Sequence, residues 1–178
     1  MKVVTYDMEM LCWDDKEEVG DIIEIAAVLV DLRTGQINKE YSVLVKPDSG
    51  LKVSSFCTEL TGITQRMVDK QGVDLTEAMR RLHKQISPKH PWYAWGKDRE
   101  TLQRECAKHS IDIDPSNYHN IAPLIRMMYQ KNRTLGQREV CENLGLEVVT
   151  PCHRALPDAV TLGRIVAKLF GGEPRLHH

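Results

Sequence analysis

Apolar and polar residues alternate in blocks that predict strands in the first third of the chain. A short apolar run over 3–6 predicts a first strand. Residues 22–30 are apolar except for Glu24, which indicates a central strand buried on both faces. Turn residues over 31–35 separate it from a third predicted strand over 37–45. The last two strands therefore read as an antiparallel hairpin.

Farther along the chain, apolar positions recur with the spacing of helices. The expected elements are a short helix and turn over 54–64, a helix that begins at Gln65 with Thr64 as its cap, a helix over 75–86, a fourth strand over 92–95, a helix over 97–109, a short fifth strand and a helix within 118–129, and helices over 134–144 and 155–170. The acidic segment 14–21 reads as a loop. A strand meander followed by alternating helices and strands predicts an α/β fold, with a mixed sheet flanked by helices.

The composition is that of an ordinary soluble protein, with 42% hydrophobic and 28% charged residues. We expect one domain over 1–172 and a tail over 173–178 that is typical of a cloning remnant. No apolar stretch approaches a membrane span, and early acidic residues interrupt any signal-peptide pattern. We therefore expect a cytoplasmic protein that does not contact a membrane.

Cysteine spacing and net charge narrow the chemistry further. The five cysteines form no close pairs, which favours reduced thiols over a disulfide framework or a zinc site. A net charge of -1 gives no general attraction to nucleic acid. A phosphate-bearing partner must therefore be bound locally, by a metal ion or by a small basic patch.

Two carboxylates, Asp7 and Glu9, follow the first predicted strand. Side chains on a strand repeat every second residue, so both point to the same face. Two such charges repel by roughly 4 kcal/mol at about 4 Å and an effective dielectric near 20. A divalent cation would offset this repulsion. The alternative is that the strand ends in a solvated acidic turn.

Two more carboxylates and a histidine stand near the predicted ends of elements. Asp98 follows the fourth strand at the start of a helix, and Asp158 lies in the first turn of the last helix. His153 precedes Asp158 by five positions. Each of these three residues also has an ordinary structural explanation when it is taken alone. Acidic residues in the first turn of a helix interact favourably with the helix dipole, and a lone histidine is usually a surface residue.

Taken together, the pattern Asp7-x-Glu9, Asp98, His153-x4-Asp158 resembles the DEDDh group of 3′-to-5′ exonucleases, the DnaQ-like branch of the ribonuclease H-like fold. The segments that resemble its three motifs are 4–9, 95–102 and 153–159, and 54–64 is similar to the subgroup of ERI-type and KapD-like proteins, many of which trim RNA. The resemblance implies a mixed five-stranded sheet, an antiparallel meander plus parallel strands, flanked by helices.

Three features depart from the pattern of this group. Met10 stands where many relatives have threonine, and Pro157 precedes the aspartate of the third motif. The spacing between Gly96 and Asp98 is one residue shorter than the spacing expected in close relatives. Proline is tolerated in the first turn of a helix, where its missing N–H is not needed. None of these departures removes a ligand or the histidine.

The resemblance also implies how the site would work. Asp7, Glu9, Asp98 and Asp158 would hold two divalent cations, and hard oxygen ligands suit Mg²⁺ or Mn²⁺. A metal pair can activate a water and stabilise the leaving 3′ oxygen of a phosphodiester. His153 would be the general base, because an unperturbed imidazole is neutral at working pH and still accepts a proton.

Substrate contacts rest on less specific residues. The backbone of Met8 would meet the terminal nucleotide, and Met10, Leu60 and Thr61 are candidates to pack against its base. Apolar contacts of this kind tolerate any base. The alternative is that these residues are ordinary core. Arg154, beside the histidine, is a candidate for phosphate binding.

A basic stretch and the expected function complete the prediction. The basic residues either follow a strand of nucleic acid or form a solvated helix face: Arg126, Lys131, Arg133 and Arg138.

We expect a metal-dependent exonuclease that releases nucleoside 5′-monophosphates from single-stranded 3′ ends of RNA, DNA or both, with RNA somewhat favoured. A non-catalytic regulatory or adaptor protein and a polymerase proofreading subunit are the alternatives. Some relatives form dimers, so a homodimer stays open.

Overall fold

The computed structural model describes residues 1–15 and 20–171. Part of the predicted loop over 14–21 and the whole tail over 173–178 lie outside the described residues. The strands are β1 (Lys2–Met10), β2 (Ile22–Asp31), β3 (Gln36–Leu44), β4 (Trp92–Ala94) and β5 (Tyr118–Asn120). The helices are α1 (Ser55–Thr61), α2 (Gln65–Gln71), α3 (Leu75–Gln85), α4 (Asp98–Lys108), the 3₁₀ turn η1 (Pro115–Asn117), α5 (Ala122–Met128), α6 (Gln137–Leu144) and α7 (Ala155–Phe170).

The strands form one mixed sheet in the order β3-β2-β1-β4-β5. β1 to β3 pair antiparallel as a meander, while β4 pairs parallel with both β1 and β5. The predicted fold class is therefore confirmed. Every residue of 22–30 is buried, as expected for a strand covered on both faces.

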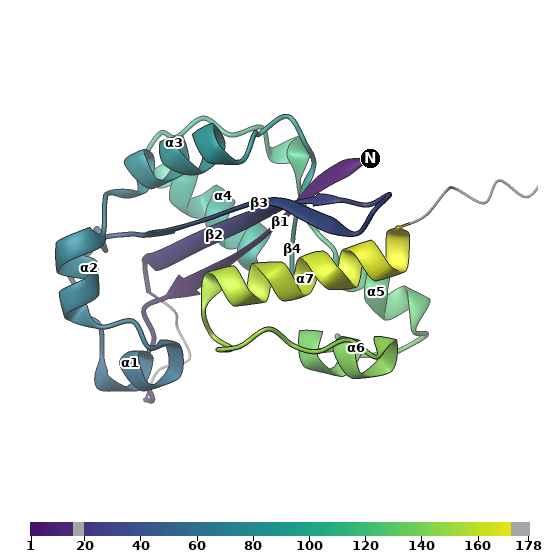
Figure 1. Ribbon diagram of the computed structural model, residues 1–178. Helices are drawn as coiled ribbons and strands as arrows, with labels where there is room; N and C mark the ends of the chain where they lie inside the picture. The colour runs from purple at the N-terminus through teal and green to yellow at the C-terminus, as the bar shows by residue number, and fades with distance from the viewer. Residues whose placement is uncertain (16–19, 172–178) are drawn as a thin grey trace, which may run out of the picture.

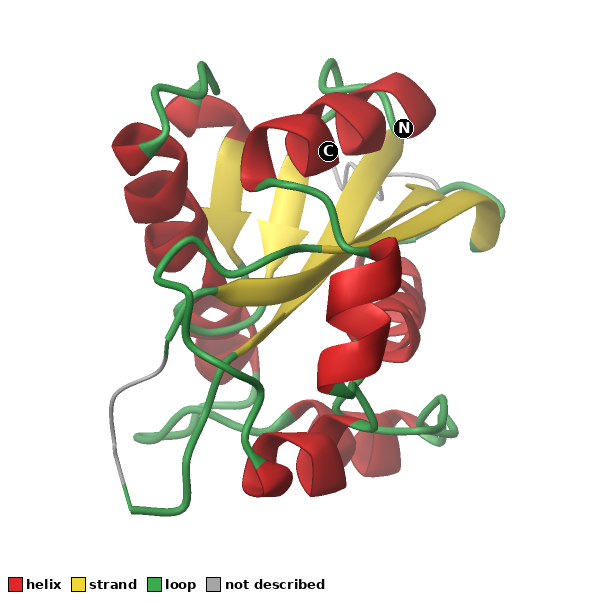
Figure 2. Ribbon diagram, turned by 90° about the vertical axis from the view of Figure 1, so that its left-hand side faces the viewer, coloured by secondary structure: helices red, strands yellow, loops and turns green. Residues whose placement is uncertain are grey.

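Helices cover both faces of the sheet (Figures 1 and 2). α7 lies along one face with α6 beside it, and their apolar side chains pack on Val3, Val28 and Val30. On the other face, α3 and α4 pack over Tyr6 and Met8. α1 and α2 enclose a small third cluster at the end of the sheet where β1 finishes. No helix within the described residues is long and apolar enough to cross a bilayer.

The structure corrects several predicted boundaries. β1 continues through Met10, and Asp7 and Glu9 pair with residues of β2. The alternative of a solvated acidic turn after the strand is therefore wrong. Helix α6 begins at Gln137 and not at 134, since Leu135 before it is buried and its carbonyl accepts a hydrogen bond from Trp95 Nε1 at 3.1 Å.

Two predicted capping features are present. The Thr64 side chain accepts a hydrogen bond from the Met67 N–H, so Thr64 caps α2 as predicted. Pro157 is the third residue of α7, where its missing N–H leaves no helical carbonyl without a donor. The departure at Pro157 from the exonuclease pattern therefore leaves the start of α7 intact.

Candidate active site

Three carboxylates converge where the end of β1 meets the first turn of α7. One oxygen each of Asp7, Glu9 and Asp158 lie within 4.8 Å of one another, and all three residues are half-buried. Strand alternation directs Asp7 and Glu9 to the face that α7 covers. On the same face, Thr5 Oγ1 donates a hydrogen bond to the Ala159 carbonyl at 2.8 Å, which fixes α7 against β1.

Asp98 joins this cluster from the neighbouring strand. β4 ends at Ala94, and a turn with Gly96 at φ 74° leads into α4, so that Asp98 accepts a hydrogen bond from the Met8 N–H. The turn is held by Asn120, whose Oδ1 accepts the Gly96 N–H at 3.2 Å. Asn120 was not predicted, and its place on β5 gives no local signal. Asp98 is not one of the three residues that meet within 4.8 Å, but its charge acts on Asp7.

The carboxylates perturb one another strongly. Burial, followed by the charges of Asp98, Glu9 and Asp158, raises the pKa of Asp7 well above its ordinary value. Burial and then Asp158 raise the pKa of Glu9 to about 8. The pKa of Asp98 rises to about 7 through burial, although the Met8 N–H opposes the shift.

Asp158 follows the same trend, because burial raises its pKa while the backbone N–H groups of His153 and Arg154 oppose the shift. Crowded, partly buried carboxylates of this kind repel one another and retain their protons. A nearby positive charge would stabilise their ionised forms. Hard divalent cations prefer oxygen ligands of this kind. The residues present therefore fit a divalent-cation centre.

His153 lies beside this centre on the loop that enters α7. It is exposed, and its backbone adopts a left-handed conformation with φ 59°, which is uncommon for a residue with a side chain. Its N–H donates a hydrogen bond to Asp158 Oδ2 at 3.0 Å. The structure thus brings together the histidine and the carboxylate that the sequence spaced five positions apart.

The predicted substrate residues have different surroundings. Met8 is only 5% exposed, so a contact with a ligand would use its backbone. Met10 is half-buried and packs against the core. Thr61 is 3% exposed, and its hydroxyl donates to the Cys57 carbonyl at 2.7 Å and accepts from the Ile63 N–H at 3.0 Å.

Leu60, by contrast, is 40% exposed. Of the two neighbouring residues in α1, only Leu60 therefore has an exposed side chain. The predicted base contact through the Thr61 side chain requires a correction, because this side chain turns inward and completes the end of α1.

Arg154 already has a partner. Its Nε and Nη2 donate to Glu24 Oε2 and Oε1 at 3.0 and 2.8 Å. In the sequence, Glu24 stands out only as an interruption of an apolar run. That interruption was a usable signal, because a charge in a strand buried on both faces requires a cation nearby.

Two residues of the basic stretch, Arg133 and Arg138, contact neighbouring side chains. Arg133 makes two hydrogen bonds to Glu139, at 2.9 and 2.8 Å, on the exposed surface of the molecule. Arg138 Nη2 lies 3.5 Å from Cys152 Sγ, next to the loop that carries His153. Arg133 lies between α5 and α6 and not on a helix, so the alternative of a solvated helix face does not apply to it.

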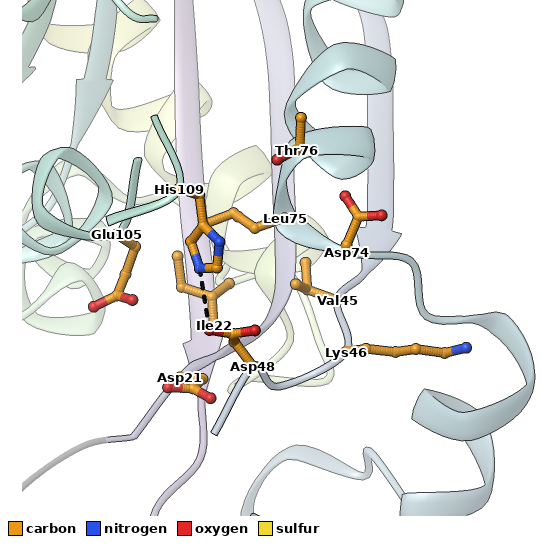
Figure 3. A pocket seen from close by; sticks show the side chains of 10 residues that line it. All are labelled: Asp21, Ile22, Val45, Lys46, Asp48, Asp74, Leu75, Thr76, Glu105 and His109. Carbon is orange, nitrogen blue, oxygen red and sulfur yellow. Dashed lines mark ion pairs between the residues drawn. The ribbon is translucent and has the colours of Figure 1, made fainter. Parts of the chain in front are cut away.

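A separate cavity of ≈ 110 Å³ lies among the start of β2, the end of β3, the start of α3 and the end of α4 (Figure 3). Its lining includes Ile22, Val45, Leu75 and His109, and His109 Nε2 lies 3.9 Å from Asp48 Oδ2. None of the predicted site residues lines this cavity. It is therefore distinct from the carboxylate cluster.

The sheet order and the flanking helices define an α/β protein with the ribonuclease H-like fold. The sequence pattern of the RNase T exonuclease family matches residues 4–166. The chain belongs to this exonuclease family.

Curated relatives carry related names. The chain is 28% identical over 196 residues to the 3′-5′ exonuclease Snipper of Drosophila melanogaster, covering 94% of this chain and 68% of Snipper. It is 43% identical over 74 residues to ERI1 exoribonuclease 2 of Xenopus laevis, covering 41% of this chain and 11% of that protein. The human 3′-5′ exoribonuclease 1 is 24% identical over 179 residues, and the chain spans about half of it, with coverage of 92% and 51%.

Among solved structures, the nuclease domain of 3′hExo, a DEDDh family member bound to rAMP, matches with a TM-score of 0.83 and 23% identity. The match covers 94% of this chain and 90% of that domain. At this identity the likeness establishes the fold.

Proposed function

We propose that this protein is a metal-dependent 3′-to-5′ exonuclease that removes nucleoside 5′-monophosphates from single-stranded 3′ ends. The observation that carries the proposal is the convergence of one carboxylate oxygen each of Asp7, Glu9 and Asp158 within 4.8 Å, with the backbone N–H of His153 donating a hydrogen bond to Asp158. Membership of the exonuclease family supports the same reaction. Relatives named as exoribonucleases favour RNA over DNA as the substrate.

The four acids have a common role in this proposal. Asp7, Glu9, Asp98 and Asp158 would hold two divalent cations, Mg²⁺ or Mn²⁺, whose charge would favour the ionised carboxylates against burial, the main cause of their raised pKa, and against the nearby negative charges. When bound, such a pair supplies activation of the attacking water and stabilisation of the leaving 3′ oxygen. The Met8 N–H keeps Asp98 turned toward β1.

His153 takes the proton from the attacking water. Its side chain is exposed, so a water and a substrate can reach it. The hydrogen bond between its N–H and Asp158, together with its left-handed backbone, sets the direction in which the side chain leaves the backbone. A positioned general base of this kind contributes about 10²- to 10⁴-fold to a rate.

The residues proposed to contact the substrate are chosen by which of their groups are accessible. Leu60 offers an exposed apolar side chain on α1 that can pack against the terminal base, and Met8 offers its backbone between the two acids of β1. Contacts of these two kinds do not read the identity of a base. We therefore expect little sequence preference.

A non-catalytic adaptor on the same fold would bind nucleic acid or protein without this cluster. Crowded half-buried acids destabilise a protein that has no cation to bind. The intact cluster therefore favours the catalytic function over the adaptor.

A time course on 5′-end-labelled single-stranded RNA and DNA tests the proposal, with Mg²⁺, Mn²⁺ or EDTA. We expect ladders that shorten from the 3′ end and stop in EDTA, and a circular RNA of the same sequence should stay intact. Asp7→Asn should give no ladder while it keeps the circular dichroism spectrum of the fold. Internal cuts, cleavage in EDTA or digestion of the circle would refute the proposal.

A further inference from the structure

Glu24 is a buried carboxylate to which the proposed catalytic roles give no task. It lies on β2, it is 2% exposed, and its neighbours along the strand are apolar. An ionised carboxylate at this depth is strongly unfavourable unless donors surround it. The two oxygens accept hydrogen bonds from Arg154 Nε at 3.0 Å, Arg154 Nη2 at 2.8 Å, the Ala155 N–H at 3.1 Å and Ser42 Oγ at 2.9 Å.

These contacts join three elements at one point. Ser42 comes from β3, Glu24 from β2, and Arg154 and Ala155 from the start of α7. The two parallel bonds of the arginine fix direction as well as distance. Burial raises the pKa of Glu24, but the hydrogen bonds and the charge of Arg154, with the Ala155 and Ser42 hydrogen bonds, outweigh burial and lower it. The carboxylate is therefore ionised at neutral pH.

The same contacts lie next to the proposed catalytic groups. Glu24 is directly opposite Glu9 in the β1–β2 ladder, so both side chains share a face. Arg154 is the residue after His153, and the His153 N–H is bonded to Asp158. The segment that carries the histidine is thus held at two points, on β2 through Arg154 and on α7 through Asp158.

We infer that Glu24 and Arg154 form a clamp that positions His153 and Asp158 against the acids of β1. Glu24 is a positioning residue, and Arg154 acts by binding Glu24 and not by binding phosphate. The inference rests on the proposed function and names residues that act on the same site.

Steady-state kinetics on single-stranded RNA tests the clamp with Glu24→Gln, Arg154→Gln and the double variant. Each single change should lower kcat by about 10- to 100-fold, the range for groups that orient ligands from a second layer, with KM within about twofold of wild type. The double variant should be no slower than the slower single variant, because both changes remove one interaction. All variants are compared well below their melting temperatures.

Glu105→Gln is the matched control. Glu105 is also buried, at 5% exposure, and is also paired with basic side chains, Lys108 and Arg104, but it contacts neither α7 nor the acids of β1 in any hydrogen bond or ion pair between described residues. Its loss should lower the melting temperature and leave kcat unchanged. If Glu24→Gln does not fold, Arg154→Lys replaces it, since lysine keeps the charge and loses the two-pronged geometry.

Three kinetic results would overturn the clamp. The first is a wild-type kcat in Glu24→Gln, and the second is a loss of kcat in the double variant that equals the product of the two single losses. The third is an Arg154→Gln variant whose KM rises while its kcat stays at the wild-type value. The last result would make Arg154 a phosphate ligand.

Amide hydrogen exchange separates the clamp from the proposed function. Should the wild-type protein degrade no RNA, the function fails, but the clamp still predicts faster exchange at Ala155 and His153 in Glu24→Gln, by about tenfold or more. Exchange at Val28 and Leu29 in the centre of β2 provides the reference for global stability. Unchanged exchange at both amides would overturn the clamp.

Discussion

Without metal ions, the protein should lose stability as the pH rises from about 6 to about 9. Glu9 and Asp98 have pKa values of about 8 and about 7 in the folded state, and those of Asp7 and Asp158 are also raised. In the unfolded chain these groups have their ordinary pKa near 4 and are already ionised at about pH 6. The folded state therefore binds more protons across this range, and the free energy of unfolding falls as the pH rises.

The size of the effect follows from the same pKa values. Values of about 8 and about 7 for Glu9 and Asp98 give a loss of about 4 kcal/mol between about pH 6 and about pH 9. Both side chains are half-buried, and solvent and local relaxation weaken the effects of burial and of neighbouring charges, so about 2 kcal/mol is the expected loss. For a chain of this size the melting temperature should fall by about 4–8 °C.

Thermal unfolding followed by circular dichroism in EDTA measures this slope. In Asp7→Asn, which removes one charge from the cluster, the slope should be shallower and the melting temperature at about pH 9 should be higher than in wild type. Adding Mn²⁺ should raise the melting temperature of the wild type, most strongly at high pH, because cations bind the deprotonated acids. The same addition should have little effect on Asp7→Asn.

Glu77→Gln is the control for this slope. Hydrogen bonds from Arg80 and Arg81 lower the pKa of Glu77 to about 2, so this group is ionised over the whole range. Its loss should shift the melting temperature equally at every pH. A wild-type melting temperature in EDTA that is flat or rises toward alkaline pH would refute the reasoning, as would an unaltered slope in Asp7→Asn.

Three further predictions concern single residues. His153→Ala should keep the Mn²⁺-induced rise in melting temperature and lower kcat on RNA by about 10²- to 10⁴-fold; a near-normal kcat would remove His153 from its role. Thr5→Val should lose the hydrogen bond to the Ala159 carbonyl and cost about 1 kcal/mol in urea unfolding, and an unchanged midpoint would show that this bond adds no net stability. Gly62 ends α1 at φ 72° with open space around it, so Gly62→Ala should cost about 1 kcal/mol through backbone conformation alone. Gly62→Asn should cost less, and equal losses would contradict that explanation.

The sheet could be predicted because its signals are local. The apolar run over 22–30 and the turn residues after it predict the β2–β3 hairpin, and the last helix was predicted with the bounds that α7 has. β1 was predicted too short, because Asp7 and Glu9 break the apolar pattern that marks a strand. A strand that borders an open site can carry charged residues, and periodicity alone does not reveal where such a site lies.

The candidate site was partly predictable. The motifs name the acids and His153, and the structure brings Asp7, Glu9 and Asp158 together. The pairing of Arg154 with Glu24 joins residues 130 positions apart, which no local pattern specifies. The inward turn of Thr61 depends on hydrogen bonds at the end of α1 that sequence spacing does not resolve.

Counting the Mn²⁺ ions that the protein binds tests the cation centre most directly. Calorimetric titration should give two sites per chain in the wild type and in His153→Ala, since the imidazole is not assigned as a ligand. Asp7→Asn, which keeps the shape of the side chain and loses its charge, should lose at least one site. A wild-type protein that binds no Mn²⁺, or an Asp7→Asn variant that binds as many ions as the wild type with equal affinity, would contradict this account.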